Sequence, residues 1–167
     1  MNLDTLRGTL EQMGRDVAQN YKDGLIAHDH FTTMRSLLDS IRTEVKVDGS
    51  VYEVTMTLNH YWKYVEEGVR GDRNPDSPYA NPGWKAYPHI ARWIEIKPVI
   101  PRPDARGRIP SPKSLTYLIT RSIVQHGTRG THDLANAKEV TLAFYREKIE
   151  AALRHDMYDY ITKVMRS

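Results

Sequence analysis

The chain has 167 residues, of which 40% are hydrophobic and 27% are charged, and its formal net charge is +3. These totals predict a single globular domain over residues 1–167 with a sizeable core, and they exclude the composition of a disordered chain. The absence of cysteine excludes disulfides, thiolate metal sites and a thiol nucleophile. No apolar run approaches the roughly 20 residues that cross a bilayer, so we expect no membrane contact and synthesis in the cytoplasm.

The N-terminal segment has the spacing of an amphipathic helix. Apolar residues recur at steps of three and four from Leu3 to Tyr21, which predicts a helix over residues 1–24. Gly8 and Gly14 weaken its intrinsic propensity, so packing must hold it, and Gly24 is expected to end it. A polar linker and a short helix over residues 33–38 follow.

Residues 39–58 carry the clearest strand signal. Apolar and polar residues alternate from Ile41 to Val47 and again from Tyr52 to Leu58. Asp48-Gly49 lies between the two runs, and this pair tolerates positive φ at both central positions of a tight turn. The pattern predicts a β-hairpin whose apolar face needs a helix or further strands to cover it.

The middle of the chain is irregular and contains all nine prolines, from Pro75 to Pro112. Before it, Asn59 is the expected cap of a short helix that Gly68 ends. Within it, residues 70–113 are expected to form a proline-rich loop or arm with one helix that begins at Pro88 and is closed by Pro98. Val99-Ile100 is a candidate edge strand.

Two helices are expected after the proline-rich region. Ser114 is the expected cap of the first, which ends before Gly127. Apolar residues keep helical spacing over some thirty residues of the second, which spans residues 132–166 without internal proline or glycine. The fold class is therefore α+β, with a hairpin or small antiparallel sheet packed against several helices, including long N- and C-terminal ones.

Candidate catalytic groups do not assemble into a motif. His28 and His30 supply two ligands at most, which is too few for a metal site. His126 and His132 flank a glycine-containing turn without an orienting third group, and adjacent Glu66 and Glu67 point about 100° apart on a helix. We therefore predict no enzyme, and no catalytic, metal or cofactor-binding residues. A small hydrolase or nuclease built on the histidines stays open as a minor alternative.

Basic and aromatic residues are the stronger candidates for contact with other molecules. Four basic residues of the proline-rich region are candidates for a subunit interface or a DNA-facing loop: Arg102, Arg106, Arg108 and Lys113. The candidate packing or interface anchors are aromatic: Trp62, Tyr64, Trp84 and Trp93.

The order of elements and two short motifs resemble a known family. The motifs are Tyr61-Trp62-Lys63-Tyr64-Val65-Glu66-Glu67-Gly68, and an arginine-bearing helix, residues 120–128, that ends in Gly127-Thr128. With the proline-rich loop, the helix around Trp93 and the long last helix, they resemble phage tail-completion and head-to-tail connector proteins over roughly residues 34–165. The chain departs from the family pattern at Gly68-Val69 and at Arg129-Gly130.

The resemblance implies a non-enzymatic structural protein of a virion. It would form a homo-oligomeric ring, six- or twelve-fold, at the phage neck or upper tail, and join the portal or connector to tail proteins, with possible non-specific contact with packaged DNA. It would need no cofactor and would contact no membrane. The alternative from the residues themselves is a nucleic-acid-binding domain that uses the basic loop and the aromatic side chains.

Overall fold

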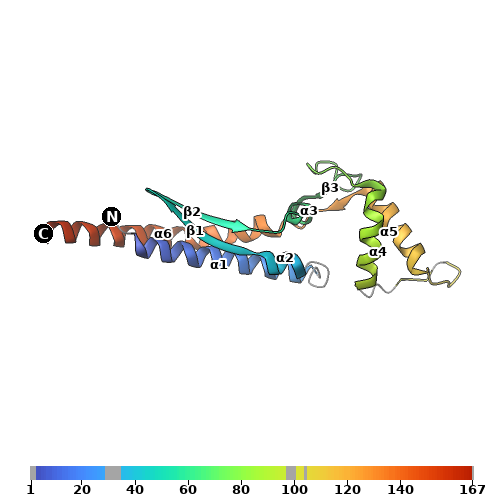
Figure 1. The fold of residues 1–167 in the computed structure, drawn as a ribbon, viewed down its shortest axis with the longest axis horizontal. Coiled ribbons are helices and arrows are strands. Elements are labelled where there is room, and N and C mark those ends of the chain that lie inside the picture. The colour runs from blue at the N-terminus through green and yellow to red at the C-terminus, as the bar shows by residue number, and fades with distance from the viewer. Residues whose placement is uncertain (1–2, 29–34, 97–100, 104, 167) are drawn as a thin grey trace. The chain divides into compact units, whose positions relative to one another are not determined.

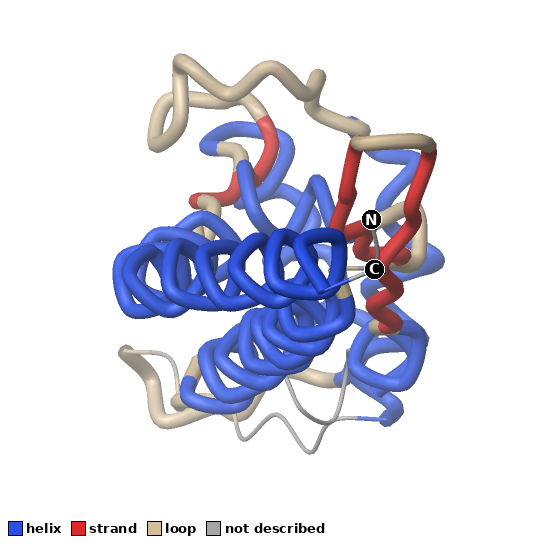
Figure 2. The backbone as a smooth tube through the Cα atoms, turned by 90° about the vertical axis from the view of Figure 1, so that its left-hand side faces the viewer, coloured by secondary structure: helices blue, strands red, loops and turns tan. Residues whose placement is uncertain are grey.

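Two long antiparallel helices and a hairpin form one of the two compact units of the chain. The computed structural model describes residues 3–28, 35–96, 101–103 and 105–166. Helix α1 is Asp4–Ala27, helix α6 is Asp133–Arg166, and strands β1 (Arg42–Asp48) and β2 (Val51–Thr57) pair antiparallel from Arg42↔Thr57 to Asp48↔Val51. The short helix α2 is Arg35–Ser40. Figures 1 and 2 show α1 and α6 side by side with the hairpin next to them.

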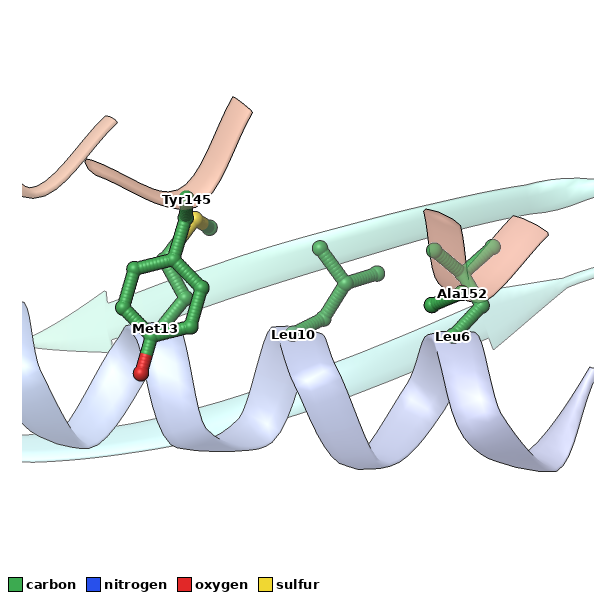
Figure 3. Close-up of a cluster of buried hydrophobic side chains, with 5 residues drawn as sticks. All are labelled: Leu6, Leu10, Met13, Tyr145 and Ala152. Carbon is green, nitrogen blue, oxygen red and sulfur yellow. The ribbon is translucent and has the colours of Figure 1, made fainter. Parts of the chain in front are cut away.

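The core of this unit lies between α1, α6 and the inner face of the hairpin. Its central cluster joins three residues of α1 to two of α6: Leu6, Leu10, Met13, Tyr145 and Ala152 (Figure 3). Val45, Tyr52 and Val54 of the hairpin pack against this cluster. The predicted spacing of α1 and the alternation of the strands are thereby confirmed, and so is the α+β class.

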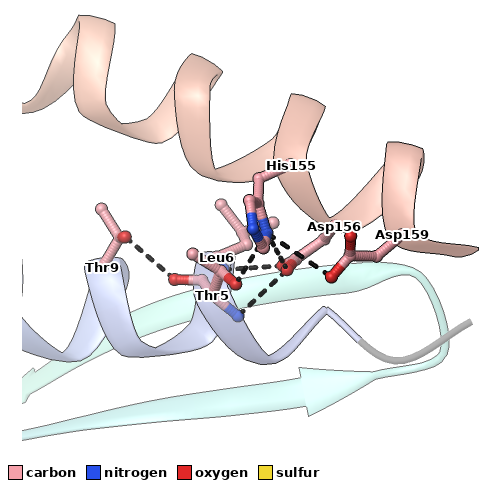
Figure 4. Close-up of polar contacts among 6 residues, drawn as sticks. All are labelled: Thr5, Leu6, Thr9, His155, Asp156 and Asp159. Atoms are coloured by element: carbon pink, nitrogen blue, oxygen red, sulfur yellow. Dashed lines mark hydrogen bonds and ion pairs between the residues drawn. The ribbon is translucent and has the colours of Figure 1, made fainter.

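Hydrogen bonds between side chains and backbone fix α6 against α1. The Asp156 carboxylate accepts from the backbone N–H of Leu6 at 2.8 Å and of Thr5 at 3.3 Å, so that a residue of α6 caps the first turn of α1 (Figure 4). The Tyr145 hydroxyl donates to Asp16 at 2.6 Å, and Asn20 donates to Thr141 at 3.0 Å. These contacts position the last turns of α6 beyond the beginning of α1 (Figure 1).

The second unit contains the elements from α3 to β4. They are α3 (Trp62–Glu67), β3 (Gly68–Val69), the 3₁₀ helix η1 (Gly83–Ala86), α4 (Tyr87–Ile96), α5 (Pro112–His126) and β4 (Thr128–Arg129). Strands β3 and β4 pair antiparallel, and α5 packs on α4 and η1. The single domain expected over residues 1–167 stays a prediction.

Several predicted ends and caps are wrong. Helix α1 continues past Gly24 to Ala27, and the missing side chain of Gly24 leaves room for Asp133, whose Oδ1 would lie 2.9 Å from an added Cβ. The hairpin turn is Gly49-Ser50, one residue later than Asp48-Gly49, since Asp48 still pairs with Val51. Only Gly49 has a positive φ, +58°, as at the first central position of a type II′ turn.

Two predicted helix caps, Asn59 and Ser114, also differ from the structure. Tyr61 stands at the start of α3 and its side chain makes no capping hydrogen bond, whereas the backbone N–H of Asn59 donates to Ser40 Oγ. Ser111 caps α5 by accepting from the Ser114 N–H at 3.2 Å, and Pro112 occupies the first turn, where no N–H is needed. Gly68 does end α3 as predicted. Lys97, Pro98 and the candidate strand Val99-Ile100 lie outside the described residues.

Candidate assembly surfaces

The two glycine-stopped segments that carry the resemblance meet at β3 and β4. Gly68 pairs with Arg129 and Val69 with Thr128. A Cβ at Gly68 would collide with the Thr128 carbonyl, and one at Gly130 with the Glu66 carbonyl. Only glycine allows backbones to approach this closely. The motif glycines therefore have a structural role, because they allow the backbones of the two segments to pack directly against each other.

Two asparagines hold the loop after β3 against this crossing. Asn74 Nδ2 donates to the carbonyls of Glu67 at 2.7 Å and Thr128 at 3.0 Å. Asn81 Nδ2 donates to the carbonyls of Ile123 at 2.7 Å and Arg70 at 3.0 Å. The sequence marked both asparagines only as turn residues, because no local pattern reveals acceptors some fifty residues away.

The predicted basic residues are all exposed, and the fold brings two of them together. Arg102 and Arg108 line one groove of about 570 Å³ with Ile109 and the first turn of α5. Lys113 lies in that turn, and Arg106 lies in the loop before it; neither lines the groove. We call these four exposed residues the basic region; Arg102 and Arg108 lie together at the groove, whose wall is partly apolar, and a role of the four in an interface or in DNA contact stays a prediction.

The predicted aromatic anchors lie at or near the surface. Trp84 is 49% exposed and stacks on Tyr117 of α5, with ring centroids 5.3 Å apart. Tyr64 is 43% exposed and meets Tyr79 edge to face at 5.0 Å, with Lys63 Nζ 5.3 Å from both ring centroids. Trp62 and Trp93 are half-buried. None of the four is a fully buried core residue, and the role of the four as packing or interface anchors stays a prediction.

The histidines do not form a site in the described part of the chain. His126 Nδ1 lies 3.5 Å from the exposed Asp72 carboxylate, and His132 is exposed with a φ of +56°. His28 is exposed, and His30 lies outside the described residues. No group of three or more candidate metal ligands occurs among the residues that the structure describes. Glu66, in contrast, is buried at 4% exposure beside the glycine crossing.

The surface that sequence reasoning missed is the last ten described residues of α6. The last buried residue of the helix is Asp156, and six large apolar side chains beyond it are between 45% and 82% exposed: Met157, Tyr158, Tyr160, Ile161, Val164 and Met165. We call Met157–Arg166 the distal segment. Its apolar residues were visible in the sequence, but there they indicated only that the helical spacing of the last helix continues.

A groove lies elsewhere on the same unit, between α1 and the hairpin. It has a volume of about 380 Å³. It is lined by three apolar residues, Leu10, Val45 and Val54, and by polar and charged residues, among them Arg7, Arg15 and Glu44. The unit therefore presents an exposed apolar helix end and a separate groove lined by both apolar and charged residues.

Membrane-spanning helices and similarity to known proteins give no further indication of function. No helix in the described ranges is long and apolar enough to cross a membrane. Comparisons of this chain with protein-family models, with curated proteins and with solved structures find no match.

Proposed function

We propose that the chain is a structural, non-enzymatic subunit of a phage virion that assembles with copies of itself into a ring at the neck or upper tail, between the portal or connector and the tail proteins. The sequence resemblance supports this role. The structural observation that carries the proposal is the exposed distal segment of α6, since apolar patches larger than a few hundred Å² on a monomer mark interaction sites. Ring subunits meet head to tail and need two unlike surfaces, which the distal segment and the α1–hairpin groove provide.

Electron microscopy of the purified chain tests the proposal. Negative staining at high protein concentration should show closed rings of uniform size, and mass photometry of the same sample should give six or twelve subunits. The measurement is repeated with purified particles that lack this protein, which serve as a template. A chain that stays monomeric at its highest soluble concentration and does not bind those particles contradicts the proposal.

The basic region of the second unit belongs to the same role, where it would face an acidic neighbour or the DNA that passes through the ring. Changing Arg102, Arg106 and Arg108 together to glutamate should weaken ring assembly or particle infectivity, because it reverses the charge that the region offers. The matched control changes three exposed basic residues of other elements, Arg92, Lys138 and Arg154, to glutamate. Intact assembly and infectivity of the first variant would remove this region from the proposal.

Nucleic-acid binding by the monomer is the second candidate, favoured by the groove that Arg102 and Arg108 line. It predicts tight binding of single- or double-stranded DNA. The logarithm of the binding constant should fall with the logarithm of salt concentration, with a slope of about 0.7 to 0.9 per phosphate contacted. Such binding by a chain that forms no rings would replace the ring proposal.

A further inference from the structure

The distal segment of α6 is an amphipathic helix whose apolar side chains are exposed. At 3.6 residues per turn its six apolar residues fall within an arc of roughly 160°, and Asp159, Thr162, Lys163 and Arg166 occupy the opposite arc. Of the ten residues only Thr162 is half-buried, and the rest are exposed. The apolar and polar side chains are thus separated on opposite faces of the helix, and both faces are exposed.

The apolar arc points away from the core. Along α6 the buried positions Tyr145, Ala152 and Asp156 follow one line toward α1. Continued by three and seven residues, that line reaches Asp159 and Lys163, which belong to the polar arc. The apolar arc is therefore turned to the side on which α1 does not lie, and folding of this unit cannot bury it.

The size of the apolar arc matches a protein interface. The exposed fractions of its six side chains leave on the order of 700 Å² of surface, close to the roughly 800 Å² that each partner buries in a standard complex. The largest apolar patch of a monomer is typically about 300–600 Å². The two tyrosines and two methionines are residue types enriched at the centres of interfaces.

We propose that the distal segment of one copy docks in the α1–hairpin groove of the next copy. Leu10, Val45 and Val54 in the lining of the groove offer apolar contacts to Ile161, which lies near the middle of the arc. Glu44 also lines the groove, and Lys163, at the border of the polar arc next to Tyr160, is the positive charge of the distal segment that is placed to meet it. Donor and acceptor are different surfaces of one unit, so the contact is heterologous and repeats around a ring. This inference rests on the proposed ring assembly and names its interface.

Cysteine cross-linking tests the contact directly, because the chain contains no cysteine. An affinity-tagged Ile161→Cys chain is mixed with an untagged Arg15→Cys chain under ring-forming conditions and oxidised. The matched control acceptor is Gln12→Cys, on the same turn of α1 but not in the groove lining. We expect a tagged–untagged disulfide dimer with Arg15→Cys at a yield at least several-fold above that with Gln12→Cys.

The opposite results overturn the inference. Equal yields with the two acceptors, or no cross-link to either, place the distal segment outside the groove. A predominant disulfide between two Ile161→Cys chains indicates a two-fold contact between distal segments instead. If the wild-type chain forms rings while the cross-link fails, the interface is wrong and the ring function stands; if the wild-type chain forms no rings with or without template, the proposed function itself fails.

A second pair of variants measures the energetic weight of the segment. Ile161→Glu with Val164→Glu should raise the dissociation constant of assembly at least about 100-fold, because charges are placed in the centre of the apolar arc. The control, Thr162→Glu with Arg166→Glu, changes the polar arc away from the proposed contact and should leave rings intact. All four side chains belong to α6 beyond its last buried residue, so the melting temperature of the monomer should change little in either variant. Rings that survive the first pair, or that are lost equally in both, contradict the inference.

Discussion

Two individual side chains of α6 set its position on α1, and both have perturbed acidities. Burial disfavours the charge of Asp156, but hydrogen bonds from the Thr5 hydroxyl and from the N–H groups of Leu6 and Thr5 outweigh it and hold its pKa below the ordinary value of 3.8. The hydrogen bond to Asp16, together with burial, raises the pKa of Tyr145 to about 12. The same hydrogen bond is the main cause that lowers the pKa of Asp16.

Replacing Asp156 should destabilise the fold in a manner that depends on pH. Asp156→Ala removes the cap of α1 and should lower the free energy of unfolding at pH 7 by about 1–2 kcal/mol. Because the folded pKa is depressed, this contribution is present above about pH 4 and is lost as the pH falls through the folded pKa. Urea unfolding followed by circular dichroism at pH 7 and at successively lower pH should show the difference from wild type shrinking. Asp159→Ala, at an exposed neighbour, is the control; a difference for Asp156→Ala that is independent of pH contradicts the capping role.

Removing the Tyr145 hydroxyl should have the opposite dependence on pH. Tyr145→Phe loses one hydrogen bond and should cost about 1–2 kcal/mol at neutral pH. Since the folded pKa of about 12 lies above the ordinary 10.0, the contribution is complete below pH 10 and declines as the pH rises toward 12. Unfolding in urea at pH 7, 10 and 11 measures it, with Tyr158→Phe, at a 71% exposed tyrosine, as the control. Equal stability of wild type and Tyr145→Phe at pH 7 would count against a stabilising bond.

At the scale of elements, periodicity predicts what is local and fails where a partner is distant. The stripe of α1 and the alternation in the hairpin were readable because each repeats within a few residues. The predicted helix end at Gly24 was wrong. That glycine lies inside the helix and leaves room for the side chain of Asp133, more than a hundred residues away. The cap at Ser114 was wrong because Ser111, three residues earlier, satisfies the same local preference, and the cap at Asn59 was wrong because α3 begins after Tyr61 without a side-chain cap. The pairing of β3 with β4 carries no local signal at all.

Two glycine substitutions should have opposite effects for a stated reason. Gly68 has a φ of +68°, and an added Cβ meets the Thr128 carbonyl, so Gly68→Ala should cost several kcal/mol or prevent the second unit from folding. Gly8 lies in α1 with nothing within 4 Å of an added Cβ, so Gly8→Ala should stabilise by up to about 1 kcal/mol. Thermal unfolding of both variants and of the wild type measures the two changes in stability. A tolerated Gly68→Ala would mean that the crossing can open without loss.

At the scale of the whole molecule, the sequence led to the basic region but not to the distal segment. Charge and proline content mark exposed loops directly, which is why the four basic residues lie at the surface as expected. Helical spacing, however, does not state which stripe of a long helix is buried. Neighbouring Ala152 and Leu153 are 5% and 37% exposed, and that difference is set by where α1 packs. Which apolar side chains of α6 stay exposed, and which residues line the α1–hairpin groove, both depend on tertiary packing. The sequence therefore predicted neither surface of the proposed contact.

The first unit should fold and assemble without the second. Its central cluster and the hairpin residues packed on it include no residue between 60 and 132, and the β3–β4 crossing is held by the second unit's own hydrogen bonds, such as Thr131 N–H to the Val65 carbonyl. A chain in which a flexible Gly-Ser linker replaces residues 60–132 should therefore unfold cooperatively and keep the circular dichroism of two long helices. It should also retain the Ile161→Cys to Arg15→Cys cross-link, because donor and acceptor both lie in the retained unit. The full-length chain with the same cysteines is the control. A shortened chain without a cooperative transition would show that the two units fold as one, and a folded one that no longer cross-links would mean that the second unit contributes to the contact between copies.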